Sequence, residues 1–520
     1  VGADALLVNT TGVGNVAVGT FALDANTTAS NNTAVGYLAL GANQTGTANV
    51  AVGYSALTVS TSSYNTGVGH NALAANSSGD FNVALGRNAL IANTSASYNT
   101  GLGANALASN TDAANNTAVG YAALTANTTG TRHTALGRGA LDAMVDGSDS
   151  TALGYNALGA HTGAAATAVG SECMALNTGS QNSGFGYGVL TTNSTGGYNT
   201  GVGYQALTTN DTGSYNTAVG TTALKVNLAD NNTAVGHNAL IANTTAAYNT
   251  AVGALALAAN TTGHTNTAVG YNTLNDNTTA LYNTAIGGHA MDNTTTGGSN
   301  VAVGYDALGK NVSDVANVAV GYACMEDANG SGFCTAMGYA AGLDLTTGDN
   351  NLCLGYNAGS SSSPSGTLTT ESNEICLGND AISQAHIQVD WTVASDQRDK
   401  TDFTALDLGL DFVKALEPVT YKWDKRSKYA EEGDDLDTVT HDGTHKEDWL
   451  DIGFKAQEVE ALEIAAGYNK SSKTNLTTTL SGDGKQYGIQ YSKFVPILVK
   501  AIQELSAEVE ELKQQLNQEE

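Results

Sequence analysis

The chain is built on a repeat of 16 or 17 residues, and this regularity constrains its fold more than any other feature of the sequence. A glycine ends the phrase Asn-Thr-Ala-Val-Gly, or a close variant, at positions 19, 36, 53, 69, 86, 103, 120, 137, 154, 170, 186, 203, 220, 236, 253, 270, 287, 304, 321, 338 and 355. Each unit carries only two or three small to medium apolar side chains, which are too few to form a core alone. The units are therefore expected to stack on one another.

Two apolar positions recur around each glycine. The fourth residue after each of the first 19 glycines is Leu, as at Leu23, or Met, as at Met174. The residue before the glycine is also apolar, most often Val. No local backbone rule requires an apolar residue in so many copies within one chain, so both positions are predicted to be buried.

The alternation in Thr-Ala-Val-Gly and in the following Asn-Ala-Leu predicts two short strands per unit with a turn at the glycine. The Asn-Thr-Thr-Gly segments are typical of outer turns, because Asn and Gly tolerate left-handed backbone conformations. We therefore expect a mainly β fold in which residues 1–378 form a parallel β-roll or β-solenoid shaft. The spacing fails after Gly355, and a last, distorted unit is expected at 375–378.

Asn recurs four residues before the glycine in most units, for example at Asn15, Asn32 and Asn249. Stacked amides at this position predict a hydrogen-bonded ladder along the shaft. A glycan-acceptor role for the Asn-x-Thr triplets is the alternative and requires a glycosylating compartment. Tyr residues often follow the glycine or precede the Asn, which favours packing between chains over stacking on sugars.

Charge divides the chain near Ser395. Residues 1–394 hold 5 Lys/Arg and 22 Asp/Glu, whereas residues 395–520 hold 15 and 26. So few basic residues argue against nucleic acid as a partner of the first part. The sequence has no apolar run of 18 residues, so no membrane span is expected. We predict a connecting strand or linker over 379–394 and a separate charged domain over 395–520.

The five cysteines mostly occupy positions where other units have Ala, which indicates small buried residues rather than a disulfide scaffold. No Cys/His spacing resembles a zinc site, and the repeat lacks the aspartates of calcium-binding β-rolls. Neither a metal nor a cofactor is expected.

The C-terminal segment 495–517 predicts a coiled coil. Apolar residues alternate spacings of three and four along it, which is the heptad pattern. They are Val495, Leu498, Ile502, Leu505, Val509, Leu512 and Leu516. The pattern alone leaves a dimer and a trimer open.

Residues 395–403 read Ser-Asp-Gln-Arg-Asp-Lys-Thr-Asp-Phe, and further blocks follow at 406–423, 452–460 and 491–505. This region resembles the C-terminal intramolecular chaperone domain of phage endosialidases, tailspikes and tail fibres, which releases itself by autoproteolysis. One departure is Lys455, where that family usually has an aliphatic residue.

The resemblance implies a small α+β domain with a Ser-Lys dyad, in which Ser395 is the nucleophile and Lys400 its general base. A lysine desolvated by burial can lose its proton near neutral pH, so this pairing is chemically reasonable. The implied activity is that of a single-turnover, self-cleaving serine endopeptidase with no other catalysis. Cleavage between Ser395 and Asp396 is favoured over cleavage between Ala394 and Ser395. Alternatively, Ser395 and Asp396 cap a helix beside a solvated Lys400.

The repeats over residues 9–360 resemble the head repeats of trimeric autotransporter adhesins, in which three chains wind together, although that family's unit is shorter. The two resemblances together imply a homotrimeric phage tail fibre in the virion. A receptor on the host surface, for which a glycan is one candidate, and other tail proteins bound through a segment preceding Val1 are its expected partners. The alternative is a bacterial trimeric surface adhesin with the same removable chaperone. A glycan-cleaving tailspike is disfavoured, because acidic residues in the repeats are sparse and irregular.

Overall fold

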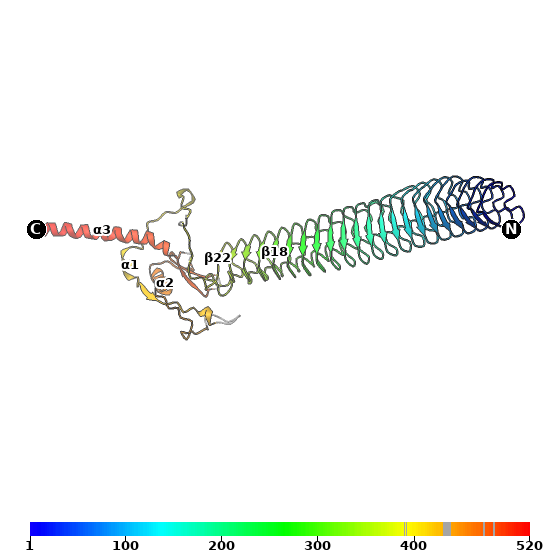
Figure 1. The fold of residues 1–520 in the computed structure, drawn as a ribbon. Coiled ribbons are helices and arrows are strands. Elements are labelled where there is room, and N and C mark those ends of the chain that lie inside the picture. The colour runs from blue at the N-terminus through cyan, green and yellow to red at the C-terminus, as the bar shows by residue number, and fades with distance from the viewer. Residues whose placement is uncertain (389–390, 392, 430–437, 472–473, 482–483, 520) are drawn as a thin grey trace. The chain divides into compact units, whose positions relative to one another are not determined.

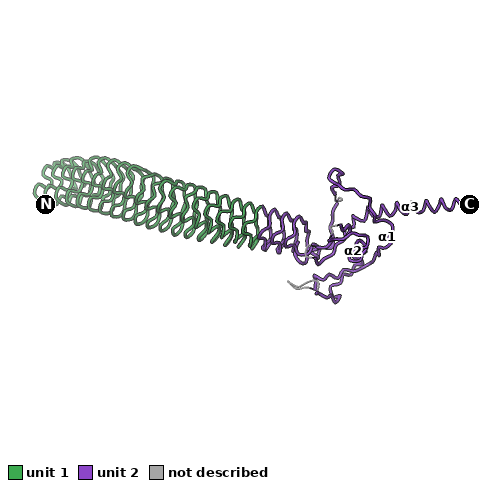
Figure 2. Tube along the Cα trace, turned by 180° about the vertical axis from the view of Figure 1, so that it is seen from behind, with its two compact units in different colours: residues 1–315 green, residues 316–520 purple. Residues whose placement is uncertain are grey.

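The computed structural model describes residues 1–520 except 389–390, 392, 430–437, 472–473, 482–483 and 520. The chain divides into two compact units, Val1–Val315 and Ala316–Glu520 (Figure 2). This division falls within the repeats and reflects compactness, so the domain boundaries expected at residues 378 and 395 stay predictions.

The first unit is a stack of coils, each containing one strand of three residues (Figure 1). Its strands are β1 (Val16–Val18), β2 (Thr33–Val35), β3 (Val50–Val52), β4 (Thr66–Val68), β5 (Val83–Leu85), β6 (Thr100–Leu102), β7 (Thr117–Val119), β8 (Thr134–Leu136), β9 (Thr151–Leu153), β10 (Thr167–Val169), β11 (Ser183–Phe185), β12 (Thr200–Val202), β13 (Thr217–Val219), β14 (Thr233–Val235), β15 (Thr250–Val252), β16 (Thr267–Val269), β17 (Thr284–Ile286) and β18 (Val301–Val303).

Each of these strands pairs in parallel with the strand of the next coil, and equivalent residues of the repeat lie opposite one another. In β7 and β8, for example, Ala118 is the register partner of Ala135. The prediction of a mainly β chain with a parallel β-solenoid is confirmed. The repeat length sets the register, because each coil returns the chain to the same edge one strand further along.

The expectation of two strands per coil is wrong. The Asn-Ala-Leu segment after the glycine forms turns, and its Leu adopts a left-handed backbone, with φ of 51° at Leu124 and 53° at Leu141. That conformation costs about 1–2 kcal/mol for an L-residue. Full burial of the Leu side chain offsets this cost, since it contributes about 1.5–3 kcal/mol. The Leu side chain is indeed completely buried, as the sequence predicts.

The glycine of each phrase stands at a corner where the coils touch. At Gly137 φ is 140°, and an added Cβ atom would lie 2.1 Å from the carbonyl oxygen of Gly154 in the next coil. A real Cβ atom cannot approach backbone so closely. Both the backbone conformation and the space therefore require glycine in every coil.

The apolar residue before the glycine is not buried in the single chain, which corrects the second burial prediction. The strand directs its central residue, usually Ala, into the coil and its first and third residues outward, because side chains alternate along a strand. Ala135 is therefore fully buried, whereas its neighbour Leu136 is 48% exposed. The interior is instead filled mainly by rows of Ala, Leu and Asn side chains.

The predicted asparagine ladder is present. The backbone N–H of Asn99 donates to Oδ1 of Asn82 (3.0 Å), and Nδ2 of Asn99 donates to the Ala113 carbonyl oxygen (2.9 Å). A second ladder, which the sequence analysis did not identify, joins amides directly, as from Nδ2 of Asn110 to Oδ1 of Asn93 (2.9 Å). Most of these buried amides are satisfied by hydrogen bonds, which removes the penalty of burying them. Oδ1 of Asn127 is an exception among the described residues.

The second unit contains four further coils and a set of helices and short strands. Its coil strands are β19 (Val318–Val320), β20 (Thr335–Met337), β21 (Leu352–Leu354) and β22 (Ile375–Leu377), and they pair in parallel in that order. The coil between β21 and β22 is longer than the others, as the irregular spacing after Gly355 indicates. All five cysteines are buried and free, as expected.

The remaining elements of this unit are η1 (Gln397–Asp399), α1 (Leu410–Ala415), β23 (Val419–Tyr421), η2 (Arg426–Lys428), β24 (Asp451–Gly453), α2 (Ala456–Ala465), β25 (Thr478–Leu480), β26 (Tyr487–Ile489), η3 (Tyr491–Lys493) and α3 (Phe494–Glu519). Strand β23 pairs antiparallel with β24, and β25 with β26. The described residues of 379–394 form no strand; residues 389, 390 and 392, part of the strand expected there, lie outside the described residues.

Candidate functional site

Ser395 and Lys400 lie at the two ends of one tight turn. The turn is the 3₁₀ helix η1, whose last hydrogen bond runs from the Lys400 N–H to the Gln397 carbonyl oxygen (3.2 Å). It brings Nζ of Lys400 to 2.5 Å from Oγ of Ser395 and to 3.4 Å from the Ser395 carbonyl oxygen. The spacing of five residues therefore places an amine against a hydroxyl and against an adjoining peptide bond.

Asp396 stabilises this turn. Its carboxylate accepts a hydrogen bond from the backbone N–H of Arg398 (2.9 Å) as the cap of η1 and binds the Arg398 guanidinium (2.6 Å). These contacts with Arg398 lower the pKa of Asp396. The capping role considered for this segment is thus real, but the capping residue is Asp396, and it coexists with the Ser395–Lys400 contact.

Both members of the pair are exposed in the single chain. A lysine amine serves as a general base only when neutral, and desolvation is what favours the neutral form. The structure therefore shows the contact that a Ser-Lys dyad needs, but not the burial expected for Lys400. Whatever desolvates this amine has to cover the turn from outside.

Residues 395–468 match the family described as chaperone of endosialidase. The matched segment begins at Ser395. It covers α1, β23, β24, α2 and the residues between them. No curated protein and no solved structure shows significant similarity to the chain. The C-terminal region is therefore of the chaperone type that the sequence resembles.

A small apolar core joins residues of the matched segment 395–468 to the start of α3. Leu408, Phe412, Val459, Phe494 and Ile497 are buried together, so α1, α2 and the start of α3 converge on one cluster. Since α3 follows the matched segment, its first two turns complete this core. Beyond Glu504, residues 505–518 of the helix are exposed.

Two carboxylates hold these elements in place, and the sequence analysis missed both. Glu504 on α3 accepts a hydrogen bond from the N–H of Leu410 (2.6 Å), the first residue of α1, and this bond lowers the pKa of Glu504. Glu463 on α2 is completely buried and accepts hydrogen bonds from Thr477 and Thr478 around β25. No periodic pattern marks either residue, because each partner lies in a different element.

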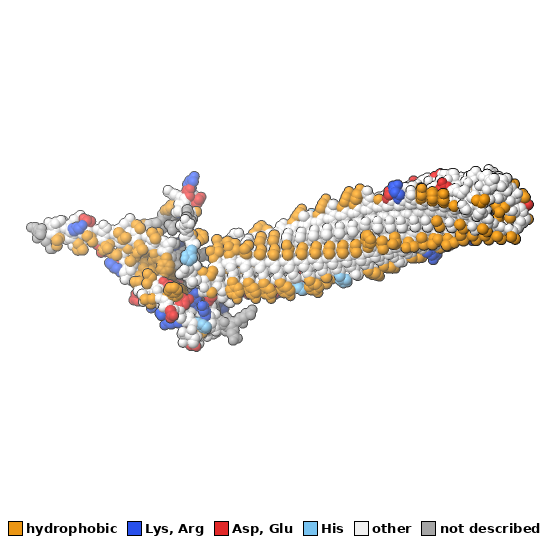
Figure 3. All heavy atoms as spheres, in the orientation of Figure 1, with side chains coloured by type: hydrophobic (Ala, Val, Ile, Leu, Met, Phe, Trp, Pro, Cys, Tyr) orange, Lys and Arg blue, Asp and Glu red, His pale blue; other side chains and the backbone are white. Residues whose placement is uncertain are grey.

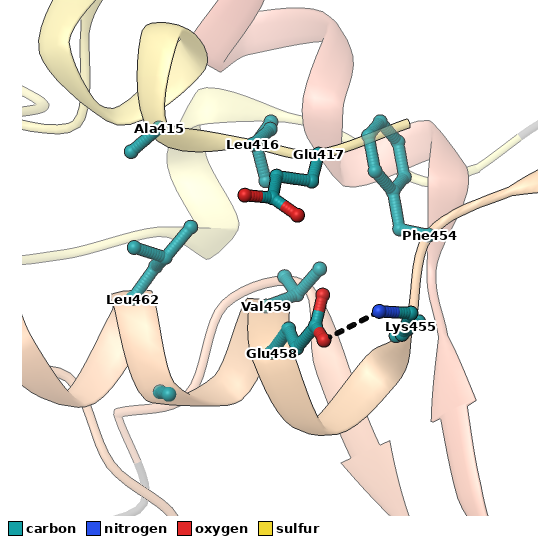
Figure 4. Close-up of a pocket in the computed structure, with 9 residues that line it drawn as sticks. Ala415, Leu416, Glu417, Phe454, Lys455, Glu458, Val459 and Leu462 are labelled. Carbon is teal, nitrogen blue, oxygen red and sulfur yellow. Dashed lines mark hydrogen bonds and ion pairs between the residues drawn. The ribbon is translucent and has the colours of Figure 1, made fainter. Parts of the chain in front are cut away.

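A cavity of about 290 Å³ lies between the end of α1 and the start of α2 (Figure 4). Leu416, Glu417, Phe454 and Val459 line it, and Lys455 at its rim forms an ion pair with Glu458 (2.7 Å). The unusual Lys455 is therefore a partly exposed helix-cap residue, and Glu458 raises its pKa. None of the lining residues belongs to 395–400, so this cavity is separate from the Ser-Lys pair.

The predicted coiled-coil seam is exposed on α3. In the single chain its seven apolar residues are between 41% and 68% exposed. A 26-residue helix with such an exposed apolar stripe is typical of one helix of a coiled coil. Among the described residues no helix is long and apolar enough to cross a membrane.

The tyrosine rows of the coils stack on themselves. Tyr54 lies between Tyr37 (5.2 Å between ring centroids) and His70 (5.0 Å), with the rings nearly parallel. A ring covered on both faces by its neighbours offers a sugar only its edge. No group of three or more His, Cys, Asp or Glu side chains that could hold a metal ion occurs in the part of the chain that the structure describes.

Proposed function

We propose that this chain is a homotrimeric, tail-fibre-like protein of a phage virion. Its β-solenoid shaft serves host recognition, and residues 395–520 drive trimerisation and folding before they are released by autoproteolysis beside Ser395. The match of residues 395–468 to the endosialidase chaperone family, together with the solenoid, supports a tail-fibre-like protein with a C-terminal chaperone. The 2.5 Å contact between Ser395 and Lys400 is the observation that carries the self-cleavage.

The exposure of Lys400 gives a reason for cleavage to follow assembly. In the single chain the Lys400 amine is open to solvent, whereas a lysine general base needs an environment that desolvates it. When other chains pack over the turn, desolvation favours the neutral amine, which can then accept the hydroxyl proton of Ser395. The same proton can later pass to the amine leaving the broken peptide bond. Cleavage thus reports correct assembly.

Two bonds adjoin Ser395. Lys400 donates to the carbonyl oxygen of Ser395, which polarises the Ser395–Asp396 bond. Attack by Ser395 on its own carbonyl would form a strained β-lactone, so cleavage there uses Ser395 of another copy. That hydroxyl takes the acyl group as an ester while the Asp396 amine leaves, and water then hydrolyses the ester. Cleavage of the Ala394–Ser395 bond instead proceeds by an N-to-O acyl shift and hydrolysis of the ester. The first residue of the released fragment, Asp396 or Ser395, identifies the bond.

The test is expression of the full chain followed by denaturing electrophoresis and intact-mass measurement. Wild type is expected to give fragments of 395 and 125 residues if the Ser395–Asp396 bond is cut. Ser395→Ala and Lys400→Met are expected to give only the intact chain, because one lacks the nucleophile and the other the base.

Two exposed residues outside the turn, Ser383 and Lys470, provide matched controls. Ser383→Ala and Lys470→Met are expected to cleave like wild type. An uncleaved wild-type trimer would overturn the proposal, as would normal cleavage in Lys400→Met. Detection of the longer fragment in purified phage particles tests its location in the virion.

A further inference from the structure

We infer that the outer strand face of the first unit is the surface through which the shafts of separate copies of this chain pack together. The outer strand face is defined as the first and third residues of strands β1–β18. This inference rests on the homotrimer of the proposed function and identifies the contact surface within it.

The third residues of the outer strand face are apolar and open to solvent in the single chain. They include Val18 (42% exposed), Leu136 (48%) and Phe185 (42%). Figure 3 shows rows of hydrophobic side chains running along the coils. Parallel sheets normally have both faces covered, and the inner face of this one is covered by its own coil. Its outer face therefore lacks the cover that such sheets have.

The composition of this face is more restricted than exposure alone requires. All 18 third residues are Val, Leu, Ile or Phe, and all 18 first residues are Thr, Val or Ser. Other outward rows are not so restricted: the row preceding the ladder Asn includes Arg132, Asp149 and Gln181. A residue type that is never polar in 18 copies, at a position open to solvent, is explained by a partner that removes it from water.

The size of the face is that of a stable interface. Eighteen strands about 4.8 Å apart and about 10 Å long span roughly 800 Å². This is about the area that each partner contributes to a standard interface, and the apolar third residues form a continuous row along it. Scattered surface hydrophobics do not account for it.

A second copy of this chain is the occupant that fits. The partner must be uncharged and apolar along the whole stack, and must present side chains at the spacing of the coils. The outer strand face of another copy meets both conditions without a shift in register. The tyrosine-containing row after the glycine is a poorer interface, because Arg87 and Arg138 interrupt it.

The test uses cysteine cross-linking in full chains that carry Ser395→Ala, so that the chaperone stays attached. Leu136→Cys places a thiol on the outer strand face, and Thr129→Cys places one on an exposed turn of the preceding coil. The native cysteines are buried and should not react. Oxidation by diamide is expected to yield covalent dimers from Leu136→Cys and none from Thr129→Cys, while light scattering measures the native mass of each.

A native trimer in which Leu136→Cys forms no dimer, or no more than Thr129→Cys, would overturn the inference and leave the trimer intact. A native monomer would contradict the proposed trimer itself, and this inference with it.

Introducing negative charges on the outer strand face provides a second measurement. The combined Leu136→Glu, Val202→Glu and Val252→Glu variant is expected to lose the shaft trimer after release of the chaperone, because burying three carboxylates per chain is costly. Thr129→Glu, Thr195→Glu and Thr245→Glu add the same charge to exposed turns and should leave the trimer unchanged. Equal trimer content in both variants would overturn the inference.

Discussion

At the scale of single residues, the left-handed Leu explains a restriction that hydrophobicity does not. The position holds Leu in 16 of its first 19 copies and Met in three, but never Val or Ile. Val and Ile are equally apolar, yet a β-branched side chain in the left-handed region is a severe outlier. The absence of β-branched residues therefore marks a left-handed corner as well as a buried position.

Leu124 tests this explanation, since it is fully buried with φ of 51°. Leu124→Met keeps an unbranched Cβ and is expected to cost less than about 1.5 kcal/mol. Leu124→Ile retains the volume but strains the backbone, which adds about 1–3 kcal/mol. Hydrogen exchange of the amides in β7 and β8 measures the difference. Equal protection in the two variants would show that volume alone governs this position.

At the scale of elements, the two asparagine ladders are interrupted over neighbouring coils. His133, Ser150 and Ala166 replace Asn in the first ladder, and Met144 and His161 replace Asn in the second. His161 is completely buried, and its Nε2 finds no hydrogen-bond partner among the described residues. The first ladder continues here through long bonds, from the Ser150 N–H to Nδ1 of His133 (3.3 Å) and from the Ala166 N–H to Oγ of Ser150 (3.4 Å). This part of the stack also holds a buried group that titrates.

Burial lowers the pKa of His161 to about 4, although a hydrogen bond with the Asn177 carbonyl opposes the shift. In the unfolded chain the pKa is about 6.5, so between these values the unfolded state binds more protons. Stability contributed by the neutral ring is complete above about pH 6.5 and is lost as the pH falls toward 4, by roughly 3 kcal/mol at most. Burial also lowers the pKa of His133, whose charged neighbours are Asp149 and Arg132.

Hydrogen exchange around β9 and β10 is therefore expected to accelerate between pH 7 and pH 4.5, after correction for the intrinsic pH dependence of exchange. His161→Asn restores the ladder residue and should weaken this acceleration. His237→Asn replaces an exposed histidine and should leave it unchanged. An unaltered pH profile in His161→Asn would exclude this ring as the cause.

At the scale of the whole molecule, the charge division near Ser395 corresponds to two different requirements. The coils satisfy their backbone and amide groups between neighbours and need little charge. The C-terminal region has a small core, exposed seam residues on α3 and many charges, which suits a body that must remain soluble by itself. Under the proposed function it acts first on assembly and is then discarded.

Removal of the C-terminal region is expected to abolish refolding but not stability. Under the proposed function, starting a shaft from three chains requires many contacts between chains at once, and α3 helices joined at their seams would hold the chain ends together. The released shaft should thus resist denaturant but fail to reassemble after dilution from guanidinium. Full chains with Ser395→Ala should recover trimers under the same conditions. Light scattering after refolding measures both, and equal recovery would contradict a chaperone role.

The stacking of the repeats, the buried Leu and the first asparagine ladder could be predicted from the sequence, as could the row of apolar residues on α3. The family resemblance implied that Ser395 lies beside Lys400. These follow from spacing or from resemblance, and spacing is preserved when the chain coils. The folded chain was needed to show which apolar row faces inward, that each coil has one strand, that amides also join directly, and that Lys400 is exposed. Alternation along a strand defines two faces but not which is inside; that depends on how the left-handed residues close the coil and on what lies against it.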